Sequence, residues 1–143
     1  MKSIDILLVE DNEGDIVLTK EALEDSKIVN AIHVVRNGKE AIDYVFNQGK
    51  YQNVLTPDLI LLDVNLPLKS GHEVLEIVKS DERTQHIPVI MLTTSSSEKD
   101  ILMSYKNHVN CYVTKPVGIN EFYNAIAKIE EFWFNIVKLP TRK

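Results

Sequence analysis

Five short apolar runs divide the chain, and a longer segment with interspersed polar residues follows each of them. The runs occupy residues 4–9, 32–35, 59–62, 89–92 and 111–113. The run 59–62 is an uninterrupted Leu-Ile-Leu-Leu, which is typical of a strand buried on both faces of a parallel sheet. The segments between the runs carry apolar residues at helical spacing, as at Val74, Leu75 and Val78. Strand and helix thus alternate five times, which predicts an α/β fold with one parallel sheet between two layers of helices.

Side chains that favour helix ends mark several of the predicted boundaries. Asn12 precedes the first helix, and Ser70 opens a capping box before the third. Gly49 is predicted to cap the C-terminal end of the second helix, and the serines at 95–97 are predicted to start the fourth. The last helix is predicted to run from about residue 120 to about residue 137.

Length and composition narrow the classes of protein that fit. The 143 residues suit a single domain spanning 1–143, and a net charge of −5 argues against nucleic acid or an anionic membrane as the main partner. Cys111 is the only cysteine, so the chain forms no internal disulfide, and a reducing compartment fits best. No apolar run approaches the roughly 18 residues of a membrane span, and no signal peptide is visible. The expected location is therefore cytoplasmic.

Residues that carry chemistry follow the predicted strands. They are Glu10 and Asp11 after the first, Asp63 after the third, Thr93 at the end of the fourth and Lys115 after the fifth. Parallel strands bring these ends to one edge of the sheet, about 4.8 Å apart for neighbours. If the first and third strands are neighbours, three carboxylates crowd together and repel unless a cation intervenes. Oxygen ligands without His or Cys suit Mg²⁺, and a phosphoryl group on Asp63 would meet the metal, Lys115 and Thr93 together.

Each of these residues taken alone has a simpler interpretation. Asp63 could be a loop carboxylate that caps the next helix, and the pair 10–11 could be ordinary charges at a helix N-terminus. Lys115 could be a solvated charge, Tyr112 a half-buried packing residue, and Cys111 a small core filler. Only the coincidence of the acidic pair with Asp63 and Lys115 favours a functional site.

Taken together, the motifs resemble a response-regulator receiver domain of two-component signalling over nearly the whole chain. They are the acidic pair 10–11, the segment Leu-Leu-Asp-Val-Asn-Leu-Pro at 61–67, Thr93-Thr94, and Tyr-Val-Thr-Lys-Pro at 112–116. The long connection before Pro57 and the segment 130–140 are similar to small stand-alone receivers that partner bacterial phytochrome-type sensor kinases. The resemblance implies a flavodoxin-like (βα)5 fold with strand order 2-1-3-4-5 and an extended last helix.

The resemblance also implies roles for the acidic residues. Asp63 would accept a phosphoryl group from a phosphohistidine on a sensor histidine kinase. Glu10, Asp11 and Asp63 would hold Mg²⁺, with the backbone carbonyl of Asn65 as a further ligand. Glu10 replaces the aspartate that is more usual in the family, which leaves open whether it reaches the metal directly or through water.

The family further implies a switch at the ends of the fourth and fifth strands. Lys115 would contact the phosphoryl group, and Thr93, followed by Thr94, would move toward it. Tyr112 would change rotamer as Thr93 moves, and Pro116 would follow a cis peptide bond that directs Lys115 into the pocket. The switched surface would then contact another protein or pass the phosphoryl group onward.

The end of the chain carries more apolar surface than packing on a sheet requires. Apolar residues recur every three or four positions along the last helix, and a helix of that length is longer than a short strand can cover. An apolar extension of about 130–143 therefore predicts a homodimer or a kinase-docking surface. The interface candidates are Phe132, Trp133, Phe134, Val137 and Leu139.

Three rival functions share parts of this pattern. A phosphatase of the haloacid-dehalogenase kind would need an acid two residues after the nucleophile, where this chain has Asn65. A degenerate receiver would lack a residue needed for phosphorylation, and none is missing. A flavin or dinucleotide binder would want a glycine-rich loop after the first strand, where the acidic segment 10–13 stands. The chain is therefore expected to be a phosphoacceptor signalling protein rather than an enzyme.

Overall fold

The computed structural model describes residues 4–24, 29–94, 97–115, 120 and 124. Five strands form one parallel sheet in the order β2-β1-β3-β4-β5. The strands are β1 (Ile4–Val9), β2 (Val29–Val35), β3 (Leu59–Leu62), β4 (Val89–Thr93) and β5 (Cys111–Thr114). Between them lie α1 (Glu13–Glu24), α2 (Gly38–Val45), the 3-10 helix η1 (Gly49–Tyr51), α3 (Gly71–Ser80) and α4 (Glu98–Lys106). The predicted α/β class and the strand order implied by the family are both confirmed.

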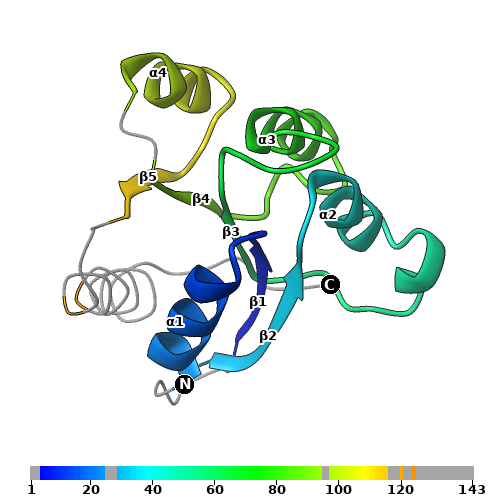
Figure 1. The fold of residues 1–143 in the computed structure, drawn as a ribbon. Coiled ribbons are helices and arrows are strands. Elements are labelled where there is room, and N and C mark those ends of the chain that lie inside the picture. The colour runs from blue at the N-terminus through cyan, green and yellow to red at the C-terminus, as the bar shows by residue number, and fades with distance from the viewer. Residues whose placement is uncertain (1–3, 25–28, 95–96, 116–119, 121–123, 125–143) are drawn as a thin grey trace.

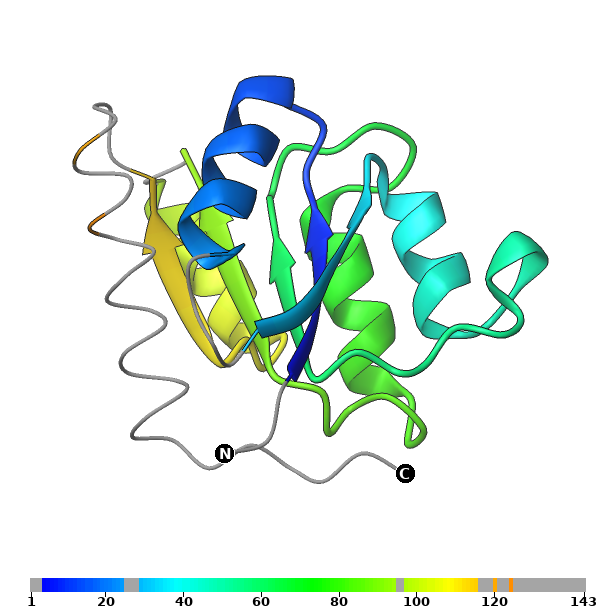
Figure 2. The ribbon, with the colours of Figure 1, turned by 90° about the horizontal axis from the view of Figure 1, so that it is seen from below.

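The sheet separates two apolar clusters, because successive residues of each central strand point to opposite faces. Leu7, Ile60 and Met91 belong to the cluster that includes residues of α2 and α3. Leu61 and its neighbours on β1 and β4 belong to the cluster that includes Ile16 of α1. Figures 1 and 2 show the same arrangement, with α1 on one face of the sheet and α2 and α3 on the other. All four residues of β3 are buried, as the uninterrupted apolar run predicts.

Three predicted helix starts are confirmed by their caps. The side chain of Asn12 accepts a hydrogen bond from the backbone N–H of Asp15 at 2.9 Å. Ser70 accepts from the N–H of Glu73 at 3.2 Å, and Ser97 caps α4 in the same way. Each cap satisfies an N–H group that has no partner within its helix.

The end of α2 differs from the prediction that Gly49 caps it. The helix ends at Val45 with Phe46 as its C-cap, and Asn47 adopts the left-handed conformation with a φ of 55°. Asparagine tolerates this conformation, and here its side chain donates to the carbonyl oxygens of Tyr51 at 3.2 Å and Val54 at 2.8 Å. Gly49, at a φ of 57°, instead begins η1. Strand β2 also begins earlier than predicted, at Val29, where it pairs with Ile4 of β1.

Several predictions fall outside the described residues. These are the cis bond before Pro116, the course of the last helix and the apolar extension of about 130–143, so each stays a prediction. Within the described part of the chain, no helix is both long enough and apolar enough to cross a membrane.

Candidate functional site

The acidic residues converge because β1 and β3 are direct neighbours. Val9 pairs with Leu62, so Glu10 and Asp63 both follow the last paired positions of their strands. Two backbone bonds fix this edge: the N–H of Asp63 donates to the carbonyl of Val9, and that of Glu10 donates to the carbonyl of Val35, each at 3.1 Å. One carboxylate oxygen from each of Glu10, Asp11 and Asp63 lies within 4.8 Å of the others. The predicted crowding of three carboxylates is therefore present.

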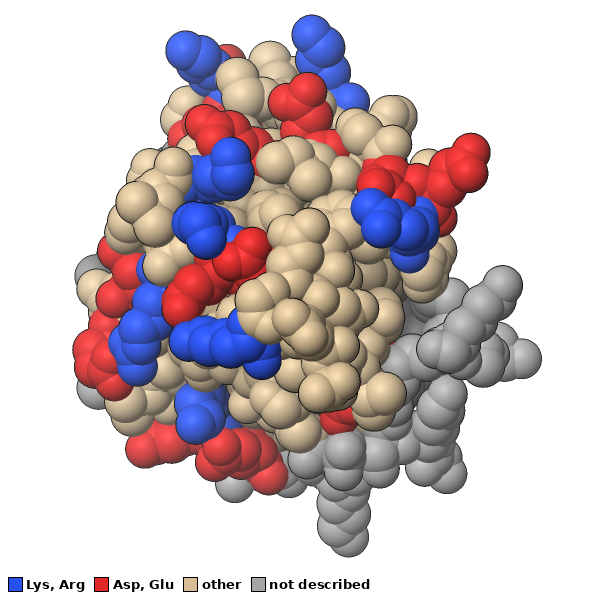
Figure 3. Space-filling model, turned by 90° about the vertical axis from the view of Figure 1, so that its right-hand side faces the viewer, with Lys and Arg blue, Asp and Glu red and all other residues tan. Residues whose placement is uncertain are grey.

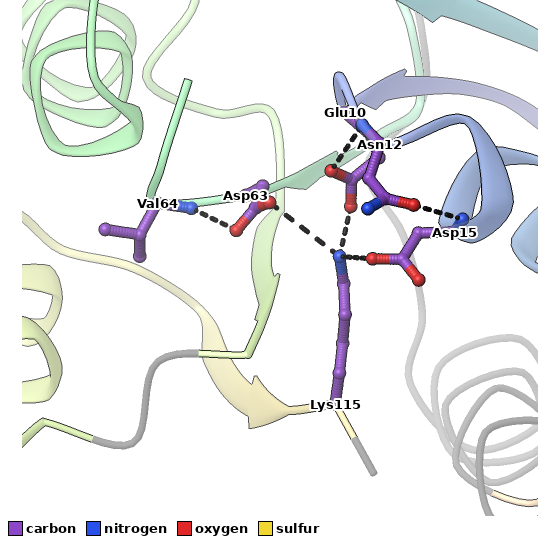
Figure 4. A network of polar contacts seen from close by, with 6 residues as sticks. All are labelled: Glu10, Asn12, Asp15, Asp63, Val64 and Lys115. Carbon is purple, nitrogen blue, oxygen red and sulfur yellow. Dashed lines mark hydrogen bonds and ion pairs between the residues drawn. The ribbon is translucent and has the colours of Figure 1, made fainter. Parts of the chain in front are cut away.

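Lys115 enters the same site from the end of β5. Its backbone N–H donates to the carbonyl of Thr93 at 2.7 Å, which ties the residue to the end of β4. Its ammonium donates to Glu10, donates to Oδ2 of Asp15 at 2.9 Å, and lies 3.7 Å from Oδ2 of Asp63. Figure 4 shows the lysine side chain extended between these carboxylates. The side chain of Lys115 is only 2% exposed, so it is a buried cation surrounded by acidic groups.

Asp63 is held on its other side by the start of the loop that follows β3. Its Oδ1 accepts a hydrogen bond from the backbone N–H of Val64 at 2.7 Å, while Oδ2 faces Lys115 (Figure 4). The carbonyl of Val64 accepts from the N–H of Gly71 at 2.8 Å, so the first residue of α3 is bonded to this loop. The carboxylate therefore has a defined orientation before any ligand arrives.

Burial and charge act in opposite directions on the two buried partners. Burial raises the pKa of Glu10 from its ordinary 4.5 to about 7, against the opposing effect of Lys115 and with a further rise from Asp63. Burial acts to lower the pKa of Lys115, but its hydrogen bonds to Glu10 and Asp15 outweigh this, and its pKa is raised. The ammonium thus stays charged at neutral pH, as burial next to several carboxylates requires.

The donor set fits a divalent metal ion. Glu10, Asp11 and Asp63 offer only carboxylate oxygens, which suit hard cations such as Mg²⁺ or Mn²⁺. With Asp15 included, the site holds four carboxylates and the single ammonium of Lys115, which gives a net charge of −3 when all of them are ionised (−4 + 1). Such an excess of negative charge in a small, partly buried volume favours a divalent cation.

The other predicted site residues lie in different environments. Thr93 is fully buried at the end of β4, whereas Thr94 and Asn65 are exposed. Tyr112, in the middle of β5, is half-buried and packs against the apolar cluster on the α2 and α3 side of the sheet. Pro116 lies outside the described residues. The structure thus brings together Glu10, Asp11, Asp63, Thr93 and Lys115, while the proposed movements of Thr93 and Tyr112 stay predictions.

Asp15 is a residue of this site that the sequence pattern did not identify. From the sequence it is only an acidic residue near the N-terminus of α1, where negative charge is common. In the structure its carboxylate bonds the buried ammonium of Lys115 across a hundred residues of chain. The one available signal was its position, since Asp15 lies in the first turn of the helix that directly follows the acidic pair 10–11.

Comparison with known proteins identifies the family of the chain. The family model described as response regulator receiver domain matches residues 6–127. The response regulator Rcp1 of Synechocystis sp. is 44% identical over 135 residues, which cover 94% of this chain and 92% of that protein. The chain therefore belongs to the response-regulator receiver family of two-component signalling proteins.

Two solved structures show how closely the fold is shared. The crystal structure of the phosphorylated cyanobacterial phytochrome response regulator RcpA has a TM-score of 0.94 and 47% identity, covering 97% of this chain and 99% of that one. The crystal structure of the Mn²⁺-bound form of Rcp1 has a TM-score of 0.93 and 43% identity, covering 96% and 99%. One of these relatives is thus a phosphorylated protein, and the other binds a divalent metal.

Proposed function

We propose that the protein accepts a phosphoryl group on Asp63 from a sensor histidine kinase in a Mg²⁺-dependent reaction. The observation that carries the proposal is the meeting of Asp63 with Glu10, Asp11 and the buried ammonium of Lys115 at one edge of the sheet. A lone carboxylate is a weak phosphoacceptor unless opposite charge offsets the incoming anion. This site supplies that charge next to an oriented aspartate.

The transfer is a substitution at phosphorus. A carboxylate oxygen of Asp63 forms the new bond to phosphorus as the bond to the histidine nitrogen of the kinase breaks, and the electron pair of that bond leaves with the imidazole. Lys115 lies near enough to the carboxylate to offset the charge of the incoming oxygens. Glu10, Asp11, Asp63 and the backbone carbonyl of Asn65 would hold Mg²⁺, which supplies electrostatic stabilisation of the transferring group.

Phosphorylation would then shift an equilibrium between two arrangements of the β4 and β5 surface. Moving such an equilibrium from mostly one state to mostly the other takes about 5.5 kcal/mol of differential interaction. Thr93 and Lys115 are bonded to each other through their backbones at 2.7 Å, so a change at one strand end is passed to the other. Thr94 and Tyr112 lie on the same two segments and complete the proposed switch.

The proposed partner is a sensor histidine kinase of the phytochrome type. The similarity to RcpA, a phytochrome response regulator, supports this choice over other kinases. The output would be contact with another protein or onward phosphotransfer, in a cytoplasmic setting, by a single receiver domain with an apolar extension. Figure 3 shows one face of the molecule, on which acidic and basic side chains are interspersed rather than gathered into a basic patch that would suit nucleic acid.

Beryllofluoride, which mimics a phosphoryl group on a carboxylate, tests the proposal directly. We expect the wild-type protein to bind it only with Mg²⁺, seen as a bound signal in ¹⁹F NMR, and a small phosphodonor to add one phosphoryl group by mass. Asp63→Asn should lose both, because it removes the nucleophile. Asp43→Asn is the matched control, since it removes a carboxylate on α2 that pairs with Lys39 outside the site.

The same experiment separates the rival functions. Continuous release of inorganic phosphate from a phosphomonoester, with no stable adduct, would favour the hydrolase instead. Wild-type protein that binds neither beryllofluoride nor phosphoryl group would favour a degenerate receiver that acts only by contact, and would contradict the proposal.

A further inference from the structure

We propose that Asp15 is a positioning residue that keeps the ammonium of Lys115 next to Asp63 while Glu10 serves as a metal ligand. This inference rests on the proposed function, since it concerns the same site. It assigns a role to Asp15 of α1, which is not one of the three carboxylates that could hold a metal ion.

The ammonium of Lys115 has three N–H donors to distribute. One donates to Oε1 of Glu10 and one to Oδ2 of Asp15 at 2.9 Å, while Oδ2 of Asp63 lies at 3.7 Å, beyond a normal hydrogen bond (Figure 4). The cation is therefore bonded on the β1 and α1 side and faces Asp63 with its remaining donor. A phosphoryl oxygen on Asp63 would be the natural acceptor for that donor.

Glu10 faces two competing demands. Its carboxylate belongs to the group of three that can hold a metal ion, and it is also a hydrogen-bond partner of Lys115. A carboxylate that ligates a divalent cation is a poorer acceptor for an ammonium, because the metal draws on the same lone pairs and repels the second cation. Within the described part of the chain, Asp15 is the other carboxylate within hydrogen-bond distance of Lys115, and it is free of this conflict.

Asp15 is well placed for such a task because its backbone is fixed. It lies in the first turn of α1, its N–H is capped by Asn12, and the next residue, Ile16, is buried in the core. Its side chain is 26% exposed, whereas that of Lys115 is 2% exposed, so the ion pair is partly shielded from water. A rigid helix thus presents an acceptor to an otherwise flexible lysine side chain.

The sign of the effect distinguishes positioning from simple electrostatics. Removing a negative charge near the site should, by Coulomb attraction alone, favour binding of an anion. If Asp15 positions Lys115, its removal should instead weaken the binding of a phosphoryl mimic, because the ammonium is no longer held near Asp63. The two explanations therefore predict changes in opposite directions.

The test is a ¹⁹F NMR titration with beryllofluoride at saturating Mg²⁺, with the Mg²⁺ affinity of each variant measured separately by calorimetry. We expect Asp15→Ala to weaken beryllofluoride binding about tenfold, the order expected for loss of one charge-assisted hydrogen bond. Asp15→Asn should weaken it less but in the same direction, and Asp15→Glu should restore binding to near the wild-type value. Glu13→Ala is the matched control, because this substitution removes the same charge from the same helical turn. The side chain of Glu13 is 69% exposed and pairs with Arg36 rather than with Lys115.

Thermal unfolding first shows that the variants are folded, so that a change in beryllofluoride binding reports on the site. If the Asp15 variants bind beryllofluoride as tightly as Glu13→Ala or more tightly, the inference is wrong. If Asp15→Glu is as impaired as Asp15→Ala, the carboxylate is not the operative group and the inference also fails. Wild-type protein that does not bind beryllofluoride would instead refute the proposed function, so the two failures are distinguishable.

Discussion

Lys115 is the residue on which the charge balance of the site depends. It is buried and lies near three carboxylates. Glu10 follows β1, Asp15 belongs to α1, and Asp63 follows β3. Like charges at these distances repel, and the ammonium offsets that repulsion in the absence of metal. A buried charge of this kind is tolerated only because it is paired on several sides.

The raised pKa of Glu10 predicts that the stability of the metal-free protein depends on pH. Its pKa in the folded protein is about 7, above the ordinary 4.5, so the folded state binds the proton more tightly than the unfolded state does. Its contribution to the free energy of unfolding should therefore be full below about pH 4.5 and be lost as the pH rises through about 7. Urea unfolding in the presence of a chelator, at several pH values across this window, measures the effect.

Glu10→Gln is the control for that measurement, because the amide does not titrate. The fall in stability across the window should be smaller in this variant than in the wild type. Equal pH dependence in the two proteins would show that another group is responsible.

At the scale of elements, the contact between α3 and the end of β3 holds Asp63 in place. Gly71 begins α3 so close to this strand end that a Cβ atom there would lie 2.0 Å from the carbonyl oxygen of Asp63 and 2.8 Å from the Cα of Val64. Only glycine allows this approach, and the backbone bond between Gly71 and Val64 depends on it. Packing of a helix start against a strand end thus orients the proposed phosphoacceptor.

Gly71→Ala should therefore both destabilise the fold and impair the site. We expect a loss of about 1–3 kcal/mol in the free energy of unfolding, as for other overpacked positions, with weaker beryllofluoride binding. Gly14→Ala is the matched control in the first turn of α1, where the added Cβ would meet only the side-chain oxygen of Asn12, at 3.4 Å. It should be neutral or stabilising by about 0.5–1 kcal/mol. Equal losses in both variants would contradict the argument.

A second contact between elements was not visible in the sequence. No histidine has the spacing of a metal ligand, yet His72 of α3 bonds Asp100 in the first turn of α4 through Nε2 at 2.9 Å. The pair joins the helix that follows Asp63 to the helix that follows the proposed switch threonines. The two residues are 28 positions apart and lie on different helices, so the sequence does not indicate that they meet. The contact exists because α3 packs beside α4.

At the scale of the whole molecule, the strand order creates the site. The order β2-β1-β3-β4-β5 puts the ends of β1, β3, β4 and β5 side by side, so residues from positions 10 to 115 converge. Binding at the carboxyl ends of the strands, where the order reverses, is the general rule for open sheets of this kind. The site therefore belongs to the topology as much as to any one segment.

The apolar extension of about 130–143 predicts that two copies of the whole protein associate. We expect the protein to be a dimer by light scattering, because residues 132–139 carry more apolar side chains than a helix packed on a sheet can bury. Trp133→Ala combined with Phe132→Ala should shift the protein to the monomer. Leu102→Ala is the control, since it removes an apolar side chain that is 71% exposed on α4. A strictly monomeric species, with or without phosphorylation, would rule out the dimer.

Local patterns in the amino-acid sequence were enough to predict most of the strands and helix starts of this protein, and they identified most of the chemical groups of its site. Apolar runs and capping residues are local signals, so five strand cores, three helix starts and the uninterrupted burial of β3 were predictable. The end of α2 was not, because Asn47 and Gly49 both tolerate the left-handed conformation, and side-chain bonds to the following loop decided between them.

Which side chains meet depends on how the strands and helices pack together. The acidic pair and Asp63 could be brought together in advance only through the strand order that the family implied, since nothing local states which strands are neighbours. The bond between Asp15 and Lys115 joins residues a hundred positions apart and depends on the placement of α1 against the end of β5. Sequence patterns record which groups are present, whereas distances between remote groups arise only when the sheet is assembled and its helices are packed.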